Sequence, residues 1–574
     1  MTIRIISINY ETHDHTAALV EDERILTVVS EERLTRKKME DAPPVSAIYE
    51  CLHIAGYKPE DIDYVVHSVF PSPRLKYYAW EGFAKILLTR GQTLWKSRSI
   101  PRLLFDLVYS TGIPTYLIYN LWPNLCIHQA LKGFRGKIHY VNHHLSHAAA
   151  AFYTSGMTEA LAVVIEGSGG DYTTSAWIAG ADGLKPVAVV QWPHSLGQFY
   201  RLITRILGFN VRRHAGKITG LAALGDSTAA LDLVRELVRC DGLDIVCSPL
   251  VYTLQSEYLA EKKIPTYFKN HRREDLAASF QRRLEEVALE FVTNAMKASR
   301  QQNLVLAGGV TANVRMNQKL AELSVVKKIF IHPGMGDDGI ALGAALYTMS
   351  ELLRKEGKVY SPPRMEHVYL GPSYSSEEIR RELKKTDLNY HRSEAVEVEI
   401  AKYLAAGKVV ARFNGRMEYG PRALGNRSIL YSPVDRSVND WLNKRLRRTE
   451  FMPFAPSTLA EYASQCFKNV EIAAHACQFM TITLDCTEWM KENCPAVVHI
   501  DGTARPHFVY KEINPSYYLI IDEFRKLTGL PVVVNTSFNM HEEPIVCSPQ
   551  DAIRAFQLGH LDLLAINEFI VVQK

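Results

Sequence analysis

Short apolar runs that end in glycine are the feature of this sequence that most restricts its fold. Leu304–Ala307 leads directly into Gly308 and Gly309, and Lys328–His332 leads into Pro333-Gly334-Met335-Gly336. Runs of this length are typical of buried strands, and strands that alternate with helical stretches indicate an α/β fold. A similar pattern opens the chain, so we predict consecutive strands at Ile3–Ile8, Ala17–Val20 and Ile25–Ser30.

Further elements follow from the spacing of the apolar residues. Val45–Ala55 and Gly339–Glu356 have helical periodicity, and the polar stretch Ala229–Arg300 is expected to be helical as well. Additional strands are predicted at Tyr64–Val69, Ile138–Val141, Ala160–Ile165 and Thr174–Ala179. Two successive α/β units are therefore expected before residue 360.

The length of 574 residues requires more than one hydrophobic core, because domains usually contain about 100–200 residues. The helical pattern of Gly339–Glu356 is followed by Ser361-Pro362-Pro363-Arg364, where proline prevents a helix from continuing. We place the main boundary there, with one domain at 1–360 and a second at 361–574. An insertion into the first domain is expected at about residues 70–135.

The charge balance argues against nucleic acid as a partner. The chain has 66 Lys and Arg residues and 62 Asp and Glu residues, which leaves a formal net charge of +4. Proteins that neutralise a phosphate backbone normally have a basic surface. The first residues lack the pattern of a secretory signal, no apolar run reaches the ~18 residues of a membrane span, and the nine cysteines are scattered; together these features predict a cytoplasmic protein.

One segment of the expected insertion combines basic and aromatic residues. Seven basic residues and one acid lie between Pro71 and Arg102, interleaved with tyrosine, tryptophan and phenylalanine. From Arg74 to Arg102, such a segment could contact a glycan, an anionic acceptor or lipid headgroups. It could equally be a solvated helical insertion whose aromatic side covers the core.

Histidines at the start of an alanine-rich run are candidates for a metal site. In VNHHLSHAAAAFY, His143 and His147 are four residues apart and would project from one face of a helix. Histidines in such a run can also be satisfied core residues. Glu166 and Asp337 each follow a predicted strand where glycine begins, and two imidazoles with one or two carboxylates would suit Fe²⁺, Mn²⁺ or Zn²⁺, with the carboxylates favouring iron. For Asp337 or its neighbour Asp338, the alternative is a helix N-cap.

Several other motifs are suited to phosphate and nucleotide binding. LAGGVTANVRMNQ places two glycines and Asn313 between a strand and a helix, where backbone N–H groups can approach phosphate. It is not a Walker loop, because the Gly-Lys-Ser/Thr ending is missing. In the second domain the motifs NGRMEYGPRALGNRSIL, LNKRLRRTEFMPFAPS, DGTARPH and VVVNTSFNMHEEPIV supply guanidinium groups, which bind phosphate or carboxylate bidentately, together with Asn and Ser. The alternative, that these arginines pair with acidic residues on the surface, would explain one such motif but does not readily explain four.

Taken together, these stretches resemble the NodU/CmcH carbamoyltransferase family. The likeness is collinear from Ile3 nearly to the C-terminus and includes THDHTAAL, EERLTRKK, NHHLSHAAAAFY, LAGGVTAN, GDDGIALGAA, GPRALGNRSIL, EFMPFAP, DGTARPH and NTSFNMHEEPIV. The resemblance implies an N-terminal domain of the actin-like ATPase superfamily, a duplicated ribonuclease H-like fold, followed by a YrdC-like α/β domain. It also implies that the second domain makes carbamoyladenylate from carbamoyl phosphate and ATP with Mg²⁺, and that the first transfers the carbamoyl group to an acceptor hydroxyl.

The resemblance assigns roles to individual residues. In the first domain His143, His147 and Asp337 match metal ligands, with Glu166 beside them, and His13 matches a histidine proposed as base. Residues in nucleotide-contacting blocks are Lys38, Gly308, Gly309 and Asn313. Residues that match the pocket for ATP and carbamoyl phosphate are Arg416, Arg422, Lys444, Arg448, Arg505 and Asn535. His144 is expected to be a neighbour of the metal or nucleotide.

Two positions depart from the family pattern. Glu166 stands where the family commonly has Asp, so that Glu166 could ligate or Asp171 could share the role, and Ala215 stands where a Glu is common. The acceptor is expected to be a sugar or natural product, with an enclosed channel between the domains for the intermediate. The alternatives are a tRNA threonylcarbamoyl-type modification enzyme and a noncatalytic nucleotide-binding partner.

Overall fold

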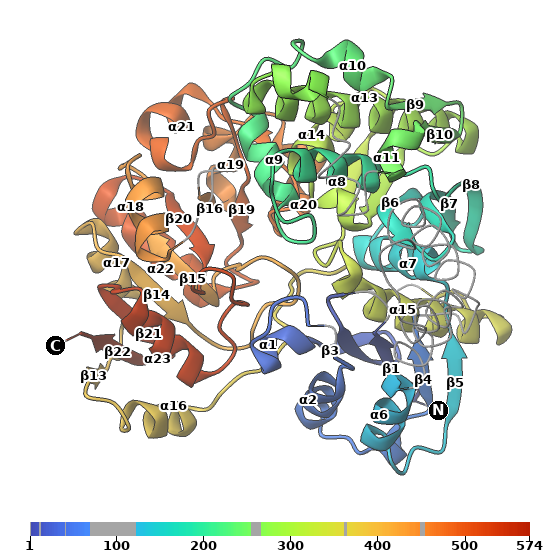
Figure 1. Ribbon diagram of the computed structural model, residues 1–574. Helices are drawn as coiled ribbons and strands as arrows, with labels where there is room; N and C mark the ends of the chain where they lie inside the picture. The colour runs from blue at the N-terminus through green and yellow to red at the C-terminus, as the bar shows by residue number, and fades with distance from the viewer. Residues whose placement is uncertain are drawn as a thin grey trace, which may run out of the picture.

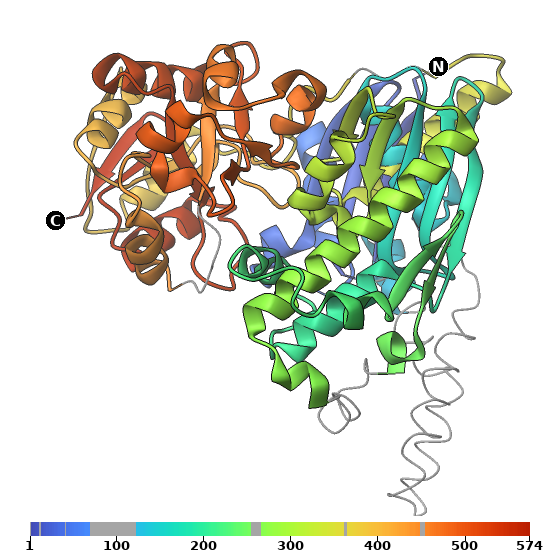
Figure 2. The same cartoon turned by 90° about the horizontal axis from the view of Figure 1, so that it is seen from above.

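The computed structural model describes residues 2–10, 13–40, 42–68, 122–253, 266–360, 364–447 and 454–573. Two five-stranded sheets and one eight-stranded sheet form the framework of this described part (Figure 1). Figure 2 shows the C-terminal domain, in orange and red, beside the N-terminal domain that holds the two five-stranded sheets. Helices cover the sheets, and the prediction of an α/β fold is confirmed.

The first sheet has the strand order β3-β2-β1-β4-β5. Its strands are β1 (Arg4–Asn9), β2 (Thr16–Glu21), β3 (Arg24–Ser30), β4 (Tyr64–His67) and β5 (Lys137–Tyr140). β1, β2 and β3 pair antiparallel, whereas β1, β4 and β5 pair parallel. Its outer face is covered by α2 (Val45–Ala55), which has the predicted bounds, and by α6 (Trp122–Ala130).

The second sheet repeats this arrangement with the order β8-β7-β6-β11-β12. Its strands are β6 (Ala160–Gly169), β7 (Tyr172–Gly180), β8 (Gly183–Gln191), β11 (Asn303–Ala307) and β12 (Lys328–Ile331). β6, β7 and β8 pair antiparallel, and β6, β11 and β12 pair parallel. The two sheets therefore share one topology, which confirms the duplicated fold expected for an actin-like N-terminal domain.

Two helices pack between the two sheets. α7 (His143–Ser155) packs on β6 and β11, and α15 (Ile340–Lys355) packs on β1 and β2. The helices approach so closely that a Cβ at Gly343 would lie 1.8 Å from the carbonyl oxygen of Ser146. The alanines of α7 permit this approach because their side chains are small. On the far face of the second sheet lie α8 (Leu196–Ile206) and α13 (Arg273–Ser299).

The stretch predicted to be helical from Ala229 to Arg300 is only partly so. α10 (Leu231–Arg235), α11 (Pro249–Thr253) and α13 are helices, but β9 (Val238–Asp241) and β10 (Asp244–Cys247) form a hairpin between them. Gly242 has a φ of 66° in the hairpin turn, a conformation that glycine adopts readily. The helical prediction is corrected there. Shorter helices of this domain are α1 (Glu31–Thr35), α9 (Ala215–Ala222) and α14 (Val314–Ala321).

The C-terminal domain contains a mixed sheet of eight strands in the order β13-β22-β21-β14-β15-β20-β16-β19. The strands are β13 (Asn389–Arg392), β14 (Val410–Phe413), β15 (Arg427–Tyr431), β16 (Ala455–Leu459), β19 (His507–Val509), β20 (Val532–Ser537), β21 (Leu563–Ile566) and β22 (Phe569–Val572). The helices are α16 (Ser376–Leu383), α17 (Val396–Ala405), α18 (Val438–Arg445), α19 (Ala463–Cys466), α20 (Val470–Cys477), α21 (Glu488–Asn493), α22 (Pro515–Thr528) and α23 (Pro549–Leu558), with a small ribbon of β17 (Leu484–Asp485) and β18 (Thr503–Ala504). This is the second α/β domain that the sequence predicted; the limits 1–360 and 361–574 stay a prediction.

The two domains are joined at several places, including one line of contact at α14 and another at Arg36. On one, Asn317 of α14 donates to the carbonyl of Thr481 at 2.7 Å, and Gln318 donates to Asp485 at 2.9 Å. On the other, the Arg36 guanidinium donates to the carbonyl oxygens of Pro544 and Ile545 at 2.8 and 2.7 Å. Buried and partly buried polar contacts of this kind tie the domains in one relative position.

Residues 74–102 and most of the expected insertion at 70–135 lie outside the described residues. Within that range α6 is described, and it packs against α2. Among the described residues no helix combines the length and apolar character needed to cross a membrane.

Candidate metal centre and polar pocket

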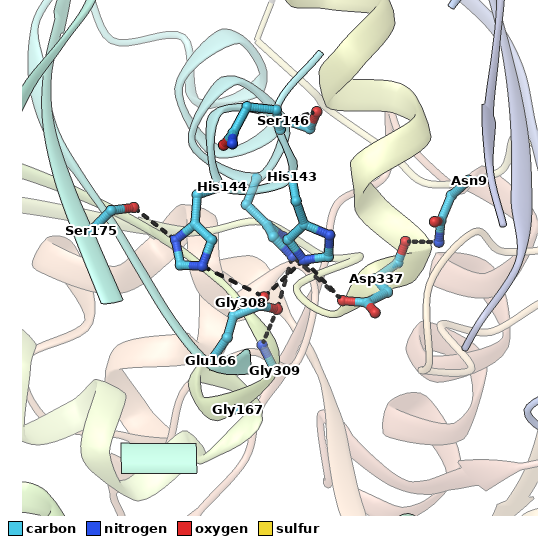
Figure 3. Close-up of polar contacts among 12 residues, drawn as sticks. Asn9, His143, His144, Ser146, Glu166, Gly167, Ser175, Gly308, Gly309 and Asp337 are labelled. Carbon is cyan, nitrogen blue, oxygen red and sulfur yellow. Dashed lines mark hydrogen bonds and ion pairs between the residues drawn. The ribbon is translucent and has the colours of Figure 1, made fainter. Parts of the chain in front are cut away.

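Four buried side chains gather between the two sheets of the N-terminal domain. His143 and His147 come from the first turns of α7, Glu166 from β6, and Asp337 from the turn that follows β12. One donor atom of each lies within 4.8 Å of the others. Figure 3 shows His143, Glu166 and Asp337 directed toward one another. The structure thus brings together all four residues that the sequence singled out as metal ligands.

The carboxylates lie close to both imidazoles. The distance from His143 Nε2 to Glu166 Oε2 is 2.8 Å, and that from His147 Nε2 to Glu166 Oε1 is 2.9 Å. Asp337 Oδ1 lies 3.6 Å from His143 Nε2 and 3.5 Å from His147 Nε2. Each carboxylate therefore faces both histidines, as ligands of a single ion would.

Local sequence explains how these side chains reach one point. Asn142 caps α7 by accepting from the backbone N–H of Leu145, which fixes where the helix begins. Residues 143 and 147 then lie one above the other on a single helix face. Gly308 has a φ of 96°, and a Cβ there would lie 2.5 Å from the carbonyl of Ile165 and 2.8 Å from Glu166 Cγ. A glycine is required at this position to leave room for the Glu166 side chain.

The donor set fits a divalent metal ion. Burial disfavours charge, yet His147 and His143 lower the pKa of Glu166 well below its usual value. Burial likewise lowers the pKa of His147, but Glu166 and Asp337 raise it to about 10. Two buried carboxylates thus need nearby positive charge, which a metal ion supplies as well as imidazolium protons do. Imidazole nitrogen with carboxylate oxygen suits Fe²⁺, Mn²⁺ or Zn²⁺.

The structure decides the roles of Asp171, Asp337 and Asp338, for which the sequence left alternatives open. Asp171 is exposed and lies outside the cluster, so Glu166 is the carboxylate that faces the histidines. Neither Asp337 nor Asp338 caps α15, whose N-cap is Gly339 without a side-chain hydrogen bond. Asp337 is therefore directed to the histidines rather than to a helix terminus.

His13 and His144 lie beside the cluster. His13 Nδ1 is 2.8 Å from Asp14 Oδ2 and 3.9 Å from Asp337 Oδ2, and its side chain is partly exposed. Burial lowers the pKa of His13, while Asp337 and Asp14 raise it to about 9. His144 Nδ1 contacts the Ser175 hydroxyl at 2.9 Å, and burial lowers the pKa of His144 to about 3. His13 is the histidine that combines access to solvent with proximity to the cluster.

Two supporting residues were missed by sequence reasoning. Asn9 at the end of β1 donates from Nδ2 to the main-chain carbonyl of Asp337 at 2.8 Å (Figure 3). The Ser195 hydroxyl donates to the carbonyls of Glu166 and Gly167 at 2.9 Å and caps α8. Asn9 comes directly after the predicted strand Ile3–Ile8, as Glu166 comes directly after the predicted strand Ala160–Ile165, and this position was the signal that could have pointed to Asn9.

The predicted nucleotide-contacting residues lie in three places. Gly309 donates its N–H to Glu166 Oε1 at 3.3 Å, and the Gly308 N–H donates to Met335 at 2.7 Å, so both glycines adjoin the metal cluster. Asn313 caps α14 and exchanges amide hydrogen bonds with Gln281. Lys38 is exposed at the domain interface, where its carbonyl accepts from Arg213.

The polar motifs of the C-terminal domain converge on neighbouring strands. Asn535 on β20 donates to the carbonyl of Ala423 at 3.1 Å and to the Ser457 hydroxyl at 3.0 Å. That hydroxyl lies 2.9 Å from His507 Nδ1. Because β20 pairs with both β15 and β16, and β16 pairs with β19, four segments distant in sequence meet around Asn535.

The predicted arginines occupy different environments. Arg416 donates to the carbonyls of Leu26, Leu370 and Gly371, at the junction between the domains. Its contact with carbamoyl phosphate stays a prediction. Arg422 and Arg505 are half-buried in the loops that precede β15 and β19, Lys444 is exposed near the end of α18, and Arg448 lies outside the described residues.

One arginine of the same motif is structural. Arg427 is fully buried, stacks over the ring of Phe413 at 3.6 Å, and donates to the carbonyls of Asn414 and Gly415. Glu418 holds this motif in shape, because Oε1 accepts from the backbone N–H groups of Leu424, Asn426 and Arg427. The loop that carries Arg422 is thereby given a defined conformation.

Comparison with known proteins finds relatives that are similar over most of the chain. The chain is 33% identical to the nodulation protein NolNO of Sinorhizobium fredii, over 98% of this chain and 79% of that protein. It is 35% identical to the nodulation protein NolO of Bradyrhizobium diazoefficiens, over 75% of this chain and 78% of that one. A crystal structure of full-length HypF in the phosphate- and nucleotide-bound form covers 61% of this chain at 11% identity, with a TM-score of 0.33 and 46% of that chain covered, a likeness too low to bear on fold or function.

Two family models also match in order along the sequence. The carbamoyltransferase N-terminus matches residues 4–346, and the carbamoyltransferase C-terminus matches residues 401–573. Together they span both domains and all of the motifs described above. The chain therefore belongs to the carbamoyltransferase family and is a carbamoyltransferase enzyme.

Proposed function

We propose that the protein is an ATP-dependent O-carbamoyltransferase with one reaction in each domain. The C-terminal domain makes carbamoyladenylate from carbamoyl phosphate and ATP, and the N-terminal domain transfers the carbamoyl group to a hydroxyl of a sugar or natural-product acceptor. The observation that carries this proposal is the buried set of two histidines and two carboxylates in one domain, paired with a separate polar convergence around Asn535 in the other.

The proposed chemistry balances in atoms and charge. Carbamoyl phosphate reacts with water to give phosphate and carbamate, and a carbamate oxygen attacks the α-phosphorus of ATP, with Mg²⁺ on its phosphates, as diphosphate leaves. The acceptor hydroxyl then attacks the carbamoyl carbon, the bond from that carbon to the AMP oxygen breaks, and the hydroxyl proton passes to a base. AMP leaves readily, so a weakly nucleophilic hydroxyl becomes able to react.

In the N-terminal domain the residues present can bind and orient the acyl group. His143, His147, Glu166 and Asp337 would hold the ion, for which Fe²⁺ is our proposal. When bound, such an ion polarises a carbamoyl oxygen or neutralises a phosphate. His13, which is partly exposed next to Asp337, is placed to accept the hydroxyl proton when its ring is neutral. Gly309, where a Cβ would meet nothing within 4 Å, offers open main-chain surface that the adenylate can approach, with Gly308 beside it.

In the C-terminal domain we take Asn535 as the centre of the proposed pocket. Its Nδ2 is held by Ala423 and Ser457, so the amide is fixed in orientation before substrate arrives. Arg422 and Arg505, in loops next to Ala423 and His507, are suited to bidentate contact with phosphate. Lys444 and Arg448 are proposed as further ligands on the family resemblance alone.

The decisive measurement separates the two reactions. Exchange of labelled diphosphate into ATP that depends on carbamoyl phosphate should occur without any acceptor. A His143→Ala, His147→Ala double variant should retain this exchange and lose transfer of the carbamoyl group to hydroxyl compounds, whereas Asn535→Ala should lose both. Absence of carbamoyl phosphate-dependent exchange in the unaltered protein would refute the proposal.

A further inference from the structure

A buried hydrogen-bonded chain crosses from the C-terminal domain to the helix that carries the two histidines. The Tyr419 hydroxyl lies 2.9 Å from His332 Nε2, and His332 Nδ1 lies 2.9 Å from the Thr154 hydroxyl. Tyr419 belongs to the second domain, His332 follows β12, and Thr154 is near the end of α7. All three are buried, with His332 and Thr154 at 0% exposure.

The direction of each hydrogen bond follows from the partners. Thr154 donates its proton to the carbonyl of Ala150 at 2.5 Å, so its oxygen accepts from His332 Nδ1–H. Nε2 of His332 is then the acceptor, and the Tyr419 hydroxyl is its donor. Burial lowers the pKa of His332 to about 3, which keeps the ring neutral and consistent with this single tautomer.

Tyr419 and Gly420 also pack closely against the turn that follows His332. A Cβ on Gly334 would lie 2.0 Å from the Tyr419 hydroxyl oxygen. Gly420 has a φ of 92°, and a Cβ there would lie 3.0 Å from the carbonyl of Pro333. Arg33 of the first domain also donates to the Gly420 carbonyl at 2.9 Å. The pair Tyr419-Gly420 is thus seated against the turn at residues 333–336 and held there from two directions.

That turn leads directly into the metal cluster. It connects His332 with Asp337, and within it the Met335 carbonyl accepts from the Gly308 N–H at 2.7 Å. On its other side, a Cβ at Gly339 would lie 2.0 Å from the Gly334 carbonyl. With contacts on both sides, a shift of Gly334 cannot be absorbed locally and must move Asp337.

We propose that Tyr419 is a positioning residue, through which docking of the C-terminal domain sets the Asp337 carboxylate in the geometry that binds the metal. This proposal rests on the metal centre of the proposed function. Carbamoyl transfer would then be efficient only when the domain that makes the intermediate is docked. No residue of the second domain needs to touch the metal for this effect.

The test measures Co²⁺ binding to the metal-depleted full-length protein by the visible absorption of the bound ion. Tyr419→Phe should weaken Co²⁺ binding by about tenfold, in the range seen when outer partners of metal ligands are removed. The matched control is Tyr369→Phe, which removes a half-buried tyrosine hydroxyl from the same domain, one that donates to the Leu424 carbonyl and accepts from Asn514. The control should bind Co²⁺ like the unaltered protein.

Hydrogen exchange supplies a second readout that a general loss of stability does not reproduce. In Tyr419→Phe, amides of residues 333–339 should exchange faster, while Tyr369→Phe leaves them unchanged. Should Tyr419→Phe fail to fold, Thr154→Val carries the test, because it breaks the far end of the same chain within the first domain. It should weaken Co²⁺ binding in the same direction.

The outcomes distinguish this proposal from the metal centre itself. If the unaltered protein binds no Co²⁺, the metal centre and this proposal fail together. The metal centre stands if the unaltered protein binds Co²⁺ and Asp337→Asn abolishes that binding. The positioning role of Tyr419 is then refuted if Tyr419→Phe or Thr154→Val binds Co²⁺ as the unaltered protein does and hydrogen exchange at residues 333–339 is unchanged.

Discussion

Shortening Glu166 to aspartate is expected to weaken metal binding, although aspartate keeps the carboxylate charge. Both oxygens of Glu166 are in use: Oε2 lies 2.8 Å from His143 Nε2, and Oε1 lies 2.9 Å from His147 Nε2. Gly309 donates to Oε1 as well. The longer side chain is therefore matched to the position of α7 in this chain.

The size of the effect follows from the geometry. Glu166→Asp withdraws the carboxylate by about one C–C bond, ~1.5 Å. Distances to the two imidazoles would lengthen to about 4 Å, whereas metal ligands lie ~2.0–2.2 Å from an ion such as zinc. One of four ligands is then out of reach, and we expect Co²⁺ or Fe²⁺ affinity to fall about 100-fold, which equals about 2.7 kcal/mol.

The assay is a titration of metal-depleted protein with Co²⁺ under anaerobic conditions. Three variants are compared: Glu166→Asp, which loses reach; Glu166→Gln, which keeps reach but loses charge; and Glu159→Asp, an exposed control just before β6. We expect the first two to bind weakly and the control to bind normally. If Glu166→Asp binds within about twofold of the unaltered protein while Glu166→Gln does not, charge alone matters and the argument from side-chain length is refuted.

Three further predictions concern stability and the domain interface. Gly308→Ala should lower the free energy of unfolding by ~2–3 kcal/mol in urea titrations, because the added Cβ meets the Ile165 carbonyl. The control Gly170→Ala is also at positive φ but in open space, and it should lower the free energy of unfolding by only ~1 kcal/mol. Equal losses in the two variants would contradict the steric argument. Arg36→Met removes two interdomain hydrogen bonds. The C-terminal domain should then unfold in a separate calorimetric transition at lower temperature. A single transition, unchanged from the unaltered protein, would contradict this prediction. The third prediction concerns the ion pair of Glu542 with the arginine and histidine at residues 213–214. Burial raises the pKa of Glu542, but these two neighbours lower it to about 2. The ion pair therefore stabilises the protein above pH ~4.5, and this stabilisation is lost as the pH falls toward 2. The difference in stability between the unaltered protein and Glu542→Gln should accordingly shrink over that range, and a constant difference would refute it.

Much of the fold could be predicted from the sequence because its signals are local. Val45–Ala55 is helical because apolar residues recur at the helical period, and the structure has the same bounds. Each run that ends in glycine became a strand followed by a turn. The hairpin at residues 238–247 was not predicted, because a polar segment beside long helices has no periodicity that separates strand from helix.

The site was predictable to the extent that its residues have a local signature. The spacing of His143 and His147 places both on one helix face, and Glu166 and Asp337 each follow a predicted strand where glycine begins. Whether Glu166 or Asp171 faces the histidines depends on how β6 packs against α7, and only the tertiary structure decides it.

The arginines show the same limit. A guanidinium group binds carbonyl oxygens and phosphate oxygens with the same donors, so no local pattern separates Arg416 and Arg427, which hold main-chain carbonyls, from arginines available to a substrate. Contacts such as Asn9 with Asp337 and Tyr419 with His332 join residues far apart along the chain. The sequence by itself determined many strands and helices of the first domain, the family motifs and the candidate ligands, because these depend on neighbours along the chain. The tertiary structure alone decided which of the candidates meet, because that depends on how the sheets and domains pack.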